Sequence, residues 1–136
     1  VTWDTTVAEM MAAEGLQEGG GNYNRHDENG FTFFYLKAEG VYYVYRGDQP
    51  VMAYSLLSGG SDAYAAQKDR QTALYGSPAD ISADTVGTLL NRLIPGSYFA
   101  DLTTWRLDDG TIAALYTIDG RNYLAYIHEQ RILGGA

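Results

Sequence analysis

The chain has 136 residues and a formal net charge of −8, and 46% of its residues are hydrophobic. This length fits one domain with a real hydrophobic core, and the apolar fraction argues against a disordered chain. The acidic balance, with Lys37 and Lys68 as the two lysines and no basic run, argues against a nucleic-acid partner or an anionic membrane surface, because both require clustered Lys and Arg.

The chain contains no cysteine, so disulfides, zinc–thiolate sites, iron–sulfur clusters and cysteine nucleophiles are excluded. No apolar run approaches the roughly 20 residues that span a bilayer, and we expect no membrane insertion. The sequence begins at Val1 rather than Met, which a removed signal peptide or a preceding lipid-anchor segment would explain. The chain also has twelve tyrosines and two lysines. Together, this composition and the start at Val1 favour an extracytoplasmic bacterial domain, secreted or anchored at the cell surface.

A first helix is predicted after Thr6, because Thr6 and Glu9 have the spacing of a capping box. Its apolar positions and its stop signal follow at Val7, Met10, Met11 and Gly15. Residues 19–21 are three glycines and predict a flexible break.

From Tyr23 to Leu57 the pattern becomes that of strands, in which aromatic and β-branched residues dominate. Turn signals separate the strands at Asn29-Gly30, at Glu39-Gly40 and at residues 46–50. An Asn-Gly pair between such runs favours a hairpin, because both central residues of the turn take a positive φ. The segment therefore predicts an antiparallel meander of about four strands.

Two helices are predicted next. The first is capped by Ser61 or Asp62 and runs to about Tyr75, where Gly76 and Pro78 end it. The second begins after Ser82 or Asp84, and Pro95-Gly96 ends it. Its apolar residues recur at i, i+3, i+4, i+7 and i+8, which predicts a buried stripe, and they are Val86, Leu89, Leu90, Leu93 and Ile94.

A second meander is predicted over residues 98–107, 111–118 and 121–128, with turns at Asp109-Gly110 and Asp119-Gly120. The two halves of the chain have matched spacing, since Gly30 and Gly110 lie 80 residues apart, as do Tyr43 and Tyr123. We therefore expect a single domain over residues 1–136 with an internal duplication of a helix-then-β-meander unit, in halves 4–57 and 62–133. The predicted fold class is α+β, with helices packed on one face of an antiparallel sheet.

Two family resemblances accompany this layout. The segment Leu74-Tyr-Gly-Ser-Pro78 resembles the helix stop of small bacterial lipoprotein domains of the outer-membrane-assembly type, which run two helices and then three antiparallel strands, as residues 62–128 do here. The doubled helix-plus-meander unit is similar to the β-lactamase-inhibitory-protein family, whose tandem repeat forms one curved sheet. Both resemblances imply an extracytoplasmic domain that binds a partner, and neither assigns a role to a residue.

The sequence contains no recognisable catalytic or cofactor motif, and we expect no catalytic residue, no cofactor and no bound metal. His26-Asp27-Glu28 groups possible ligands, but adjacent strand residues point to opposite faces, which favours a solvated strand end. His128 is the other imidazole, and the two histidines meet only if the meanders lie side by side.

Asp108-Asp109-Gly110 lacks the calcium-loop pattern and favours a turn. Arg46-Gly47-Asp48 matches the integrin-binding tripeptide, but it falls where a turn is expected.

Two-residue turns at Glu39-Gly40 and Asp119-Gly120 would assign the strand side chains to two faces. One face is nearly all apolar and is expected to pack on the helices; it carries Phe34, Leu36, Val41, Tyr43, Tyr45, Trp105, Leu107, Ile112, Ala114, Tyr116, Ile118, Tyr123, Ala125 and Ile127. The other face is rich in Tyr, Phe and Arg; it carries Phe33, Tyr35, Lys37, Tyr42, Val44, Arg46, Arg106, Ala113, Leu115, Leu124 and Tyr126. In this register Tyr35 pairs with Val44, Tyr42 with Lys37, and Arg46 with Phe33.

The second of these faces is the candidate binding surface, because Tyr and Arg combine contact area with hydrogen-bonding groups. The candidate binding residues are Phe33, Tyr35, Tyr42, Arg46 and Tyr126. The alternative for this face is a half-solvated sheet whose aromatics are simply good strand formers. The sequence thus predicts a non-catalytic binding module for an unidentified protein or glycan. The alternative function is a small-molecule site or an enzyme without a recognisable motif, built around His26 and His128.

Overall fold

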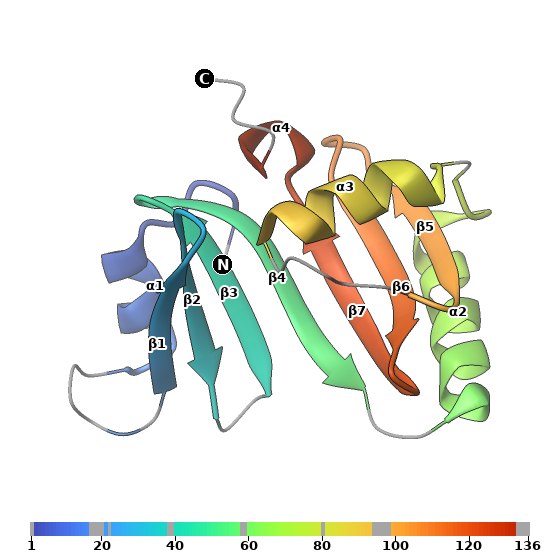
Figure 1. Cartoon of the computed structure of the whole chain (residues 1–136), viewed down its shortest axis with the longest axis horizontal. Coiled ribbons are helices and arrows are strands. Elements are labelled where there is room, and N and C mark those ends of the chain that lie inside the picture. The colour runs from blue at the N-terminus through green and yellow to red at the C-terminus, as the bar shows by residue number, and fades with distance from the viewer. Residues whose placement is uncertain are drawn as a thin grey trace.

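The computed structural model describes residues 2–16, 21, 23–37, 40–57, 60–79, 81–93 and 99–132 (Figure 1). Its elements in chain order are α1 (Val7–Ala13), β1 (Tyr23–Glu28), β2 (Phe31–Leu36), β3 (Val41–Arg46), β4 (Gln49–Leu57), α2 (Ser61–Tyr75), α3 (Ala83–Leu93), β5 (Leu102–Arg106), β6 (Ile112–Ile118), β7 (Arg121–Ile127) and α4 (Glu129–Ile132).

One seven-stranded antiparallel sheet organises the chain, with strand order β1-β2-β3-β4-β7-β6-β5. The two meanders meet where β4 pairs with β7, from Met52 opposite Ile127 to Leu57 opposite Asn122. The α+β class and the antiparallel sheet predicted from the sequence are therefore confirmed.

The tightest turns follow the sequence. Asn29-Gly30 and Asp119-Gly120 each join two strands as a two-residue turn, and all four residues have a positive φ between 51° and 83°. This is the geometry that Asn-Gly and Asp-Gly favour, because these residues tolerate the left-handed region.

The turn between β2 and β3 differs from the prediction. Leu36 pairs with Val41, so four residues (37–40) form the loop rather than two. Gly40 has the expected positive φ of 66°, and its amide bonds to the Leu36 carbonyl, whereas Glu39 lies outside the described residues. The longer loop shifts the register by two residues, so Tyr35 pairs with Tyr42 and Phe33 with Val44. The predicted pairs of Tyr35 with Val44, Tyr42 with Lys37 and Arg46 with Phe33 are wrong.

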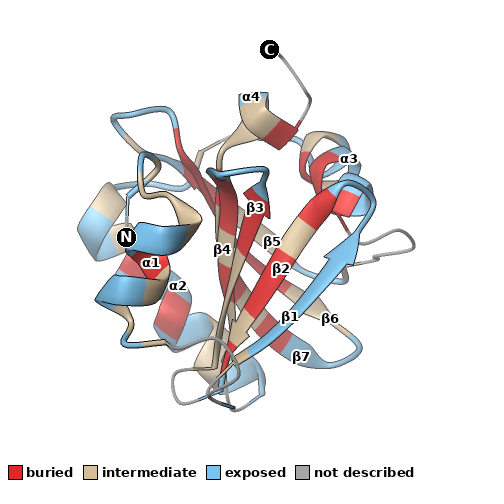
Figure 2. Cartoon of the chain, turned by 90° about the vertical axis from the view of Figure 1, so that its left-hand side faces the viewer, coloured by how far each residue is buried: buried red, intermediate tan, exposed pale blue. Residues whose placement is uncertain are grey.

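Helices cover both faces of the sheet, not one as predicted. Met10 of α1 packs on Phe34, and Tyr64 of α2 packs on the cluster around Trp105, on one side that we call the α2 face. The helices α3 and α4 pack on the other side, which we call the α3 face and which faces the viewer in Figure 1. The buried segments concentrate on the strands inside the sheet, while the edge strand β1 is largely exposed (Figure 2).

The pairing of β4 with β7 also corrects the predicted faces. Ala53 lies opposite both Tyr43 and Tyr126, so these three side chains share the α2 face. The two sets expected to form one apolar face, around Phe34 in the first half and around Ile112 in the second, therefore lie on opposite faces. Trp105 pairs with Ala113 and belongs to the α2 face.

The helix ends mostly obey the predicted signals. Thr6 and Glu9 form the capping box of α1. The Ser82 hydroxyl accepts a hydrogen bond from the Thr85 amide at the start of α3. The N-cap of α2 is Gly60, which offers no side chain, so the predicted cap at Ser61 or Asp62 is wrong.

The core of the α3 face depends on the predicted stripe of α3, whose buried members are Val86, Leu89, Leu90 and Leu93. In contrast, α2 has no apolar stripe, and the residues that it buries are Gln67 and Gln71. Ile94, Pro95-Gly96, Tyr98, Ser58-Gly59 and Gly19-Gly20 lie outside the described residues.

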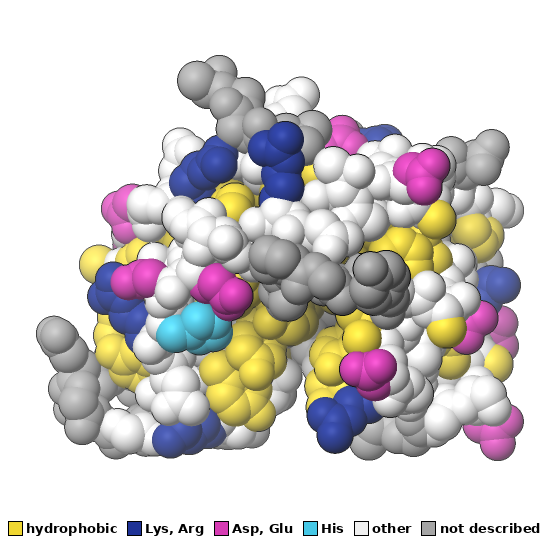
Figure 3. Space-filling model, in the orientation of Figure 1, with side chains coloured by type: hydrophobic (Ala, Val, Ile, Leu, Met, Phe, Trp, Pro, Cys, Tyr) yellow, Lys and Arg dark blue, Asp and Glu magenta, His cyan; other side chains and the backbone are white. Residues whose placement is uncertain are grey.

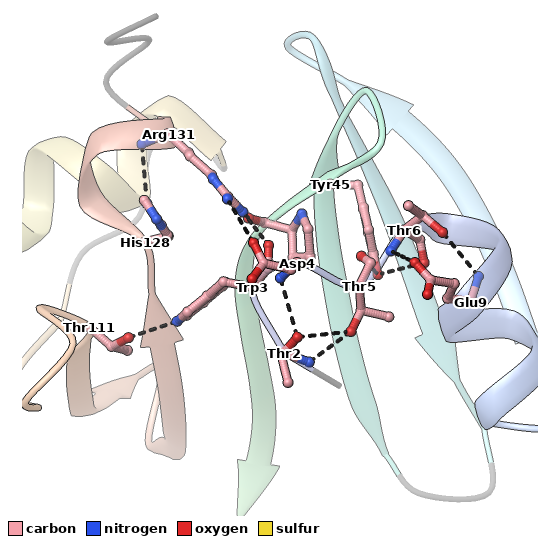
Figure 4. A network of polar contacts seen from close by, with 11 residues as sticks. Thr2, Trp3, Asp4, Thr5, Thr6, Glu9, Tyr45, Thr111, His128 and Arg131 are labelled. Atoms are coloured by element: carbon pink, nitrogen blue, oxygen red, sulfur yellow. Dashed lines mark hydrogen bonds and ion pairs between the residues drawn. The ribbon is translucent and has the colours of Figure 1, made fainter.

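Arg131 ties the N-terminal segment to the end of the chain (Figure 4). Its guanidinium donates hydrogen bonds to the carbonyls of Trp3 and Pro50 and lies 3.9 Å from the Asp4 carboxylate. Its own carbonyl accepts a hydrogen bond from Arg46 at 2.7 Å. Backbone carbonyls of two separate segments, around Trp3 and Pro50, therefore converge on the Arg131 side chain.

We expect Leu90→Ala to lower the free energy of unfolding by about 2–5 kcal/mol, because it opens a cavity under α3. Leu90 is 3% exposed, whereas Leu74 on α2 is 65% exposed. The matched control Leu74→Ala should change stability by less than about 0.5 kcal/mol. Urea denaturation measures both, and a loss below about 1 kcal/mol for Leu90→Ala contradicts the packing of α3.

Arg131→Met should cost about 1–3 kcal/mol, because it leaves two carbonyls without their charged donor. Arg121 is exposed and makes no hydrogen bond or ion pair within the described chain, so Arg121→Met is the matched control and should be nearly neutral. Thermal melts of the two variants test the hydrogen bonds of Arg131, and equal melting temperatures would show that these bonds do not stabilise the fold.

Candidate functional site

Five tyrosines form a continuous row across the α3 face, which we call the tyrosine row: Tyr35, Tyr42, Tyr54, Tyr123 and Tyr116. Each side chain comes from a different strand, in the spatial order β2, β3, β4, β7 and β6. The successive ring centroids lie 4.5, 4.6, 6.5 and 5.6 Å apart. These distances place every ring in contact with the next.

Strand register builds the row. Tyr35, Tyr42 and Tyr54 are direct cross-strand partners, and so are Tyr123 and Tyr116. Directly paired side chains on neighbouring strands lie close enough for rings to stack, and the planes of Tyr42 and Tyr54 differ by 5°. The two groups join diagonally, because Tyr54 lies opposite Ala125 and the Tyr123 ring reaches across.

The row is deep in its middle and open along its rim. Tyr54 and Tyr116 are buried, whereas the other three rings are half-buried. Leu56 pairs with Tyr123 on the same face and is 47% exposed. Figure 3 shows hydrophobic side chains at the surface of this face, on both sides of an indentation.

The hydroxyl groups of the row are not used inside the described part of the molecule, where none of the five makes a hydrogen bond. Burial raises the pKa of Tyr42, Tyr54 and Tyr116, and the neighbouring tyrosines act in the same direction. At neutral pH these groups are therefore uncharged phenols that can both donate and accept a hydrogen bond.

The structure brings together two of the five predicted binding residues. Tyr35 and Tyr42 lie side by side in the row. Phe33 shares their face but is 1% exposed, because the His26 ring stacks on it at 4.8 Å. Arg46 bonds to the Arg131 carbonyl and lies over the Phe31 ring, near the turn at the other end of β3. Tyr126 lies on the α2 face, so its place on this face is corrected.

Sequence reasoning missed Tyr54, Leu56, Tyr116 and Tyr123 as members of this surface. Tyr116 and Tyr123 were assigned to the opposite face, because the register between the two meanders was unknown. The one local signal was the tyrosine content of neighbouring strands, which marks rings but not the side of the sheet on which they lie.

The two histidines do not form a site. His26 lies 3.7 Å from Glu28 on the edge strand β1, and Asp27 points to the other face, where it accepts a hydrogen bond from Thr32. His128 follows β7 and contacts the Trp3 ring. Four strand spacings, roughly 19 Å, separate the strands of the two imidazoles.

In the two turn motifs, at residues 46–48 and 108–110, an aspartate side chain accepts a hydrogen bond from a backbone amide of the same chain. Asp48 accepts a hydrogen bond from the Val7 amide at 2.8 Å, and Arg46 of the same tripeptide is engaged as described. Asp109 accepts the Thr111 amide at 3.0 Å, the bond of a tight turn. Both segments are turns, as the sequence favoured.

Scans against protein-family models, curated proteins and solved structures found no match to this chain. Over the described ranges, no three His, Cys, Asp or Glu side chains gather as metal ligands. No helix in that part of the chain is long and apolar enough to cross a membrane. The candidate site therefore rests on the geometry of the tyrosine row alone.

Tyr54→Phe should leave stability at pH 7 nearly unchanged, because the Tyr54 hydroxyl makes no hydrogen bond to any described residue. In the unfolded chain Tyr54 ionises near its ordinary pKa of 10.0, whereas burial keeps it protonated in the folded chain. The native protein therefore loses stability as pH rises above 10, and Tyr54→Phe should reduce this alkaline loss.

Tyr45→Phe is the contrasting variant. The Tyr45 hydroxyl donates to the Thr5 carbonyl at 3.1 Å, and burial raises the pKa of Tyr45 to about 12. This variant should lose about 0.5–1.5 kcal/mol at pH 7. Urea melts at pH 7 and at pH 11 compare the two, and an equal loss for both variants at pH 7 contradicts the unpaired hydroxyl of Tyr54.

Proposed function

We propose that this chain is a non-catalytic binding module that engages its partner through the tyrosine row and Leu56. The observation that carries this proposal is the row itself, in which five neighbouring rings present hydroxyl groups that make no hydrogen bond within the described residues. Unpaired polar groups at the rim of an apolar surface are suited to bonding with a second molecule.

A protein partner fits this surface better than a small ligand. Two of the four ring contacts are stacked and two are tilted, so the rings offer edges and hydroxyl groups along a shallow surface rather than an enclosing pocket. Tyrosine is enriched where proteins bind each other, because its ring gives rigid contact area and its hydroxyl gives a hydrogen bond. A glycan stacked on the half-buried ring of Tyr35 is the competing occupant.

The alternative of an enzyme or small-molecule site around His26 and His128 has no support in the geometry, since the two imidazoles lie on strands far apart in the sheet. The extracytoplasmic location stays part of the proposal and rests on composition, that is, on a lysine-poor and tyrosine-rich chain.

An internal duplication is also proposed, and helix packing supports it. In the first half α1 packs on the side of its meander that carries Phe34 and Leu36. In the second half α3 packs on the side that carries Ala114 and Tyr116, the residues 80 positions further on. Each helix thus covers the corresponding side of its own meander, although the two sides are opposite faces of the joined sheet.

The combined change Tyr35→Ala and Tyr42→Ala tests the binding surface. Binders selected from a display library of peptides and small domains against the native chain should lose at least about tenfold in affinity for this variant. Tyr23→Ala is the matched control, since Tyr23 lies on β1 but packs with Phe34 on the α2 face.

The melting temperature of each variant is measured alongside, because Tyr42 stacks on Tyr54 and its removal costs stability as well as contact. Selected binders that retain full affinity for the folded double variant would place the preferred binding surface elsewhere. A parallel glycan array separates a sugar ligand from a protein one.

A further inference from the structure

A groove of about 520 Å³ lies on the α2 face, opposite the tyrosine row. Its floor is formed by the central strands, where Ala53 pairs with Tyr43 on one side and with Tyr126 on the other. The two rings stand as walls over the small side chains of Ala53 and Ser55. This volume lies within the range of small-molecule sites in proteins.

Each wall is held by a helix. The Tyr43 hydroxyl donates to Glu14 at the end of α1 at 3.2 Å. The Tyr126 hydroxyl lies 3.4 Å from the Tyr75 hydroxyl at the end of α2. The rings that line the groove are therefore fixed before any ligand arrives.

The N-terminal segment adds a third aromatic ring and a carboxylate. The Trp3 indole N–H donates to the Thr111 hydroxyl at 2.7 Å, and the amide of the same threonine donates to Asp109. This shared partner holds Trp3 and Asp109 next to each other on the lining of the groove. Hydrogen bonds from Thr111 lower the pKa of Asp109, so its carboxylate stays ionised at neutral pH.

We propose that this groove binds a small quaternary ammonium compound, with Trp3, Tyr43 and Tyr126 contacting the cation and Asp109 balancing its charge. Aromatic faces attract cations, and indole does so most strongly. Among the described residues that line the groove, Asp109 is the one with a full charge at neutral pH, and this lining includes no lysine or arginine.

The choice of a quaternary over a primary ammonium follows from the lining. A primary ammonium brings three N–H donors that each need an acceptor, whereas methylated nitrogen needs aromatic and aliphatic contact. Apart from Asp109 and a few hydroxyls, the side chains that line the groove are aromatic and aliphatic, among them Val41, Leu107 and Leu124.

Tryptophan fluorescence provides the measurement, because Trp105 is 1% exposed and Trp3 lies at the groove. Choline titrated into the native chain at constant ionic strength should give a saturable change with a dissociation constant on the order of 1 mM. Trp3→Phe should abolish the change. The uncharged isostere 3,3-dimethylbutan-1-ol and phosphocholine, whose phosphate meets Asp109, should both bind more weakly.

Asp109→Asn should weaken choline binding about 5–10-fold while keeping the turn, because an Asn side-chain oxygen can still accept the Thr111 amide. Asp108→Asn is the matched control, since Asp108 is exposed next to it but does not line the groove. Equal affinity for choline and its uncharged isostere, tighter binding of phosphocholine, no saturable change, or equal effects of the two Asn variants would each overturn the proposal. The Tyr35 and Tyr42 double variant should bind choline normally, so this result is independent of the tyrosine row.

Discussion

The pairing of β4 with β7 is the constraint on which the rest of this molecule depends. It joins the two meanders into one sheet. Its register also determines which face of the second meander lies on the same side of the sheet as a given face of the first. A strand shifted by one residue presents all its side chains to the opposite face. With Ala53 opposite Tyr126, Tyr54 lies opposite Ala125, and the two groups of tyrosines come together on the α3 face. A slip of one residue would separate them and would bring Tyr54 against Tyr126.

This joint also explains why helices lie on both faces. Each half of the chain buries the apolar side of its own meander under its own helix, α1 over Phe34 and α3 over Ile112. Because the joint places these two apolar sides on opposite faces, neither face is covered along its whole width. In the described part of the chain, helices cover two strips less completely: the half-buried rings of the tyrosine row beside α3, and the groove between α1 and α2.

The sequence was most informative where structure is decided locally, although the N-cap of α2 and the loop at residues 37–40 were exceptions. Asn29-Gly30 and Asp119-Gly120 specify their turns, since few other residues accept a positive φ. The stripe of α3 and the capping box of α1 likewise depend on residues three and four positions apart. The loop at residues 37–40 was misjudged because a single glycine in the left-handed region fits both a two-residue turn and a longer one, and the error shifted every pair between β2 and β3.

What the sequence did not reveal is set by contacts between distant residues. No local pattern in β4 or β7 states their register, so the membership of the tyrosine row was only partly predicted. The helix α2 carries no apolar stripe, and the residues that it buries are Gln67 and Gln71. Its sequence therefore does not indicate which side of the helix packs on the sheet. No sequence pattern marked Trp3, whose position is set by hydrogen bonds with Thr111 and Arg131, more than 100 residues away in the chain.

The two proposed sites lie on opposite faces of the same strands, and Tyr54 of the tyrosine row is also among the residues that line the groove. Along β3, Tyr42 belongs to the row and Tyr43 to the groove; along β4, Tyr54 belongs to the row and Ala53 to the groove. Successive strand residues point to opposite faces, so neighbouring residues in the sequence serve different surfaces. A substitution at one of these positions therefore acts on one surface through its side chain and on the other only through the backbone. Because that backbone is held in the middle of a seven-stranded ladder, the two surfaces can be altered separately.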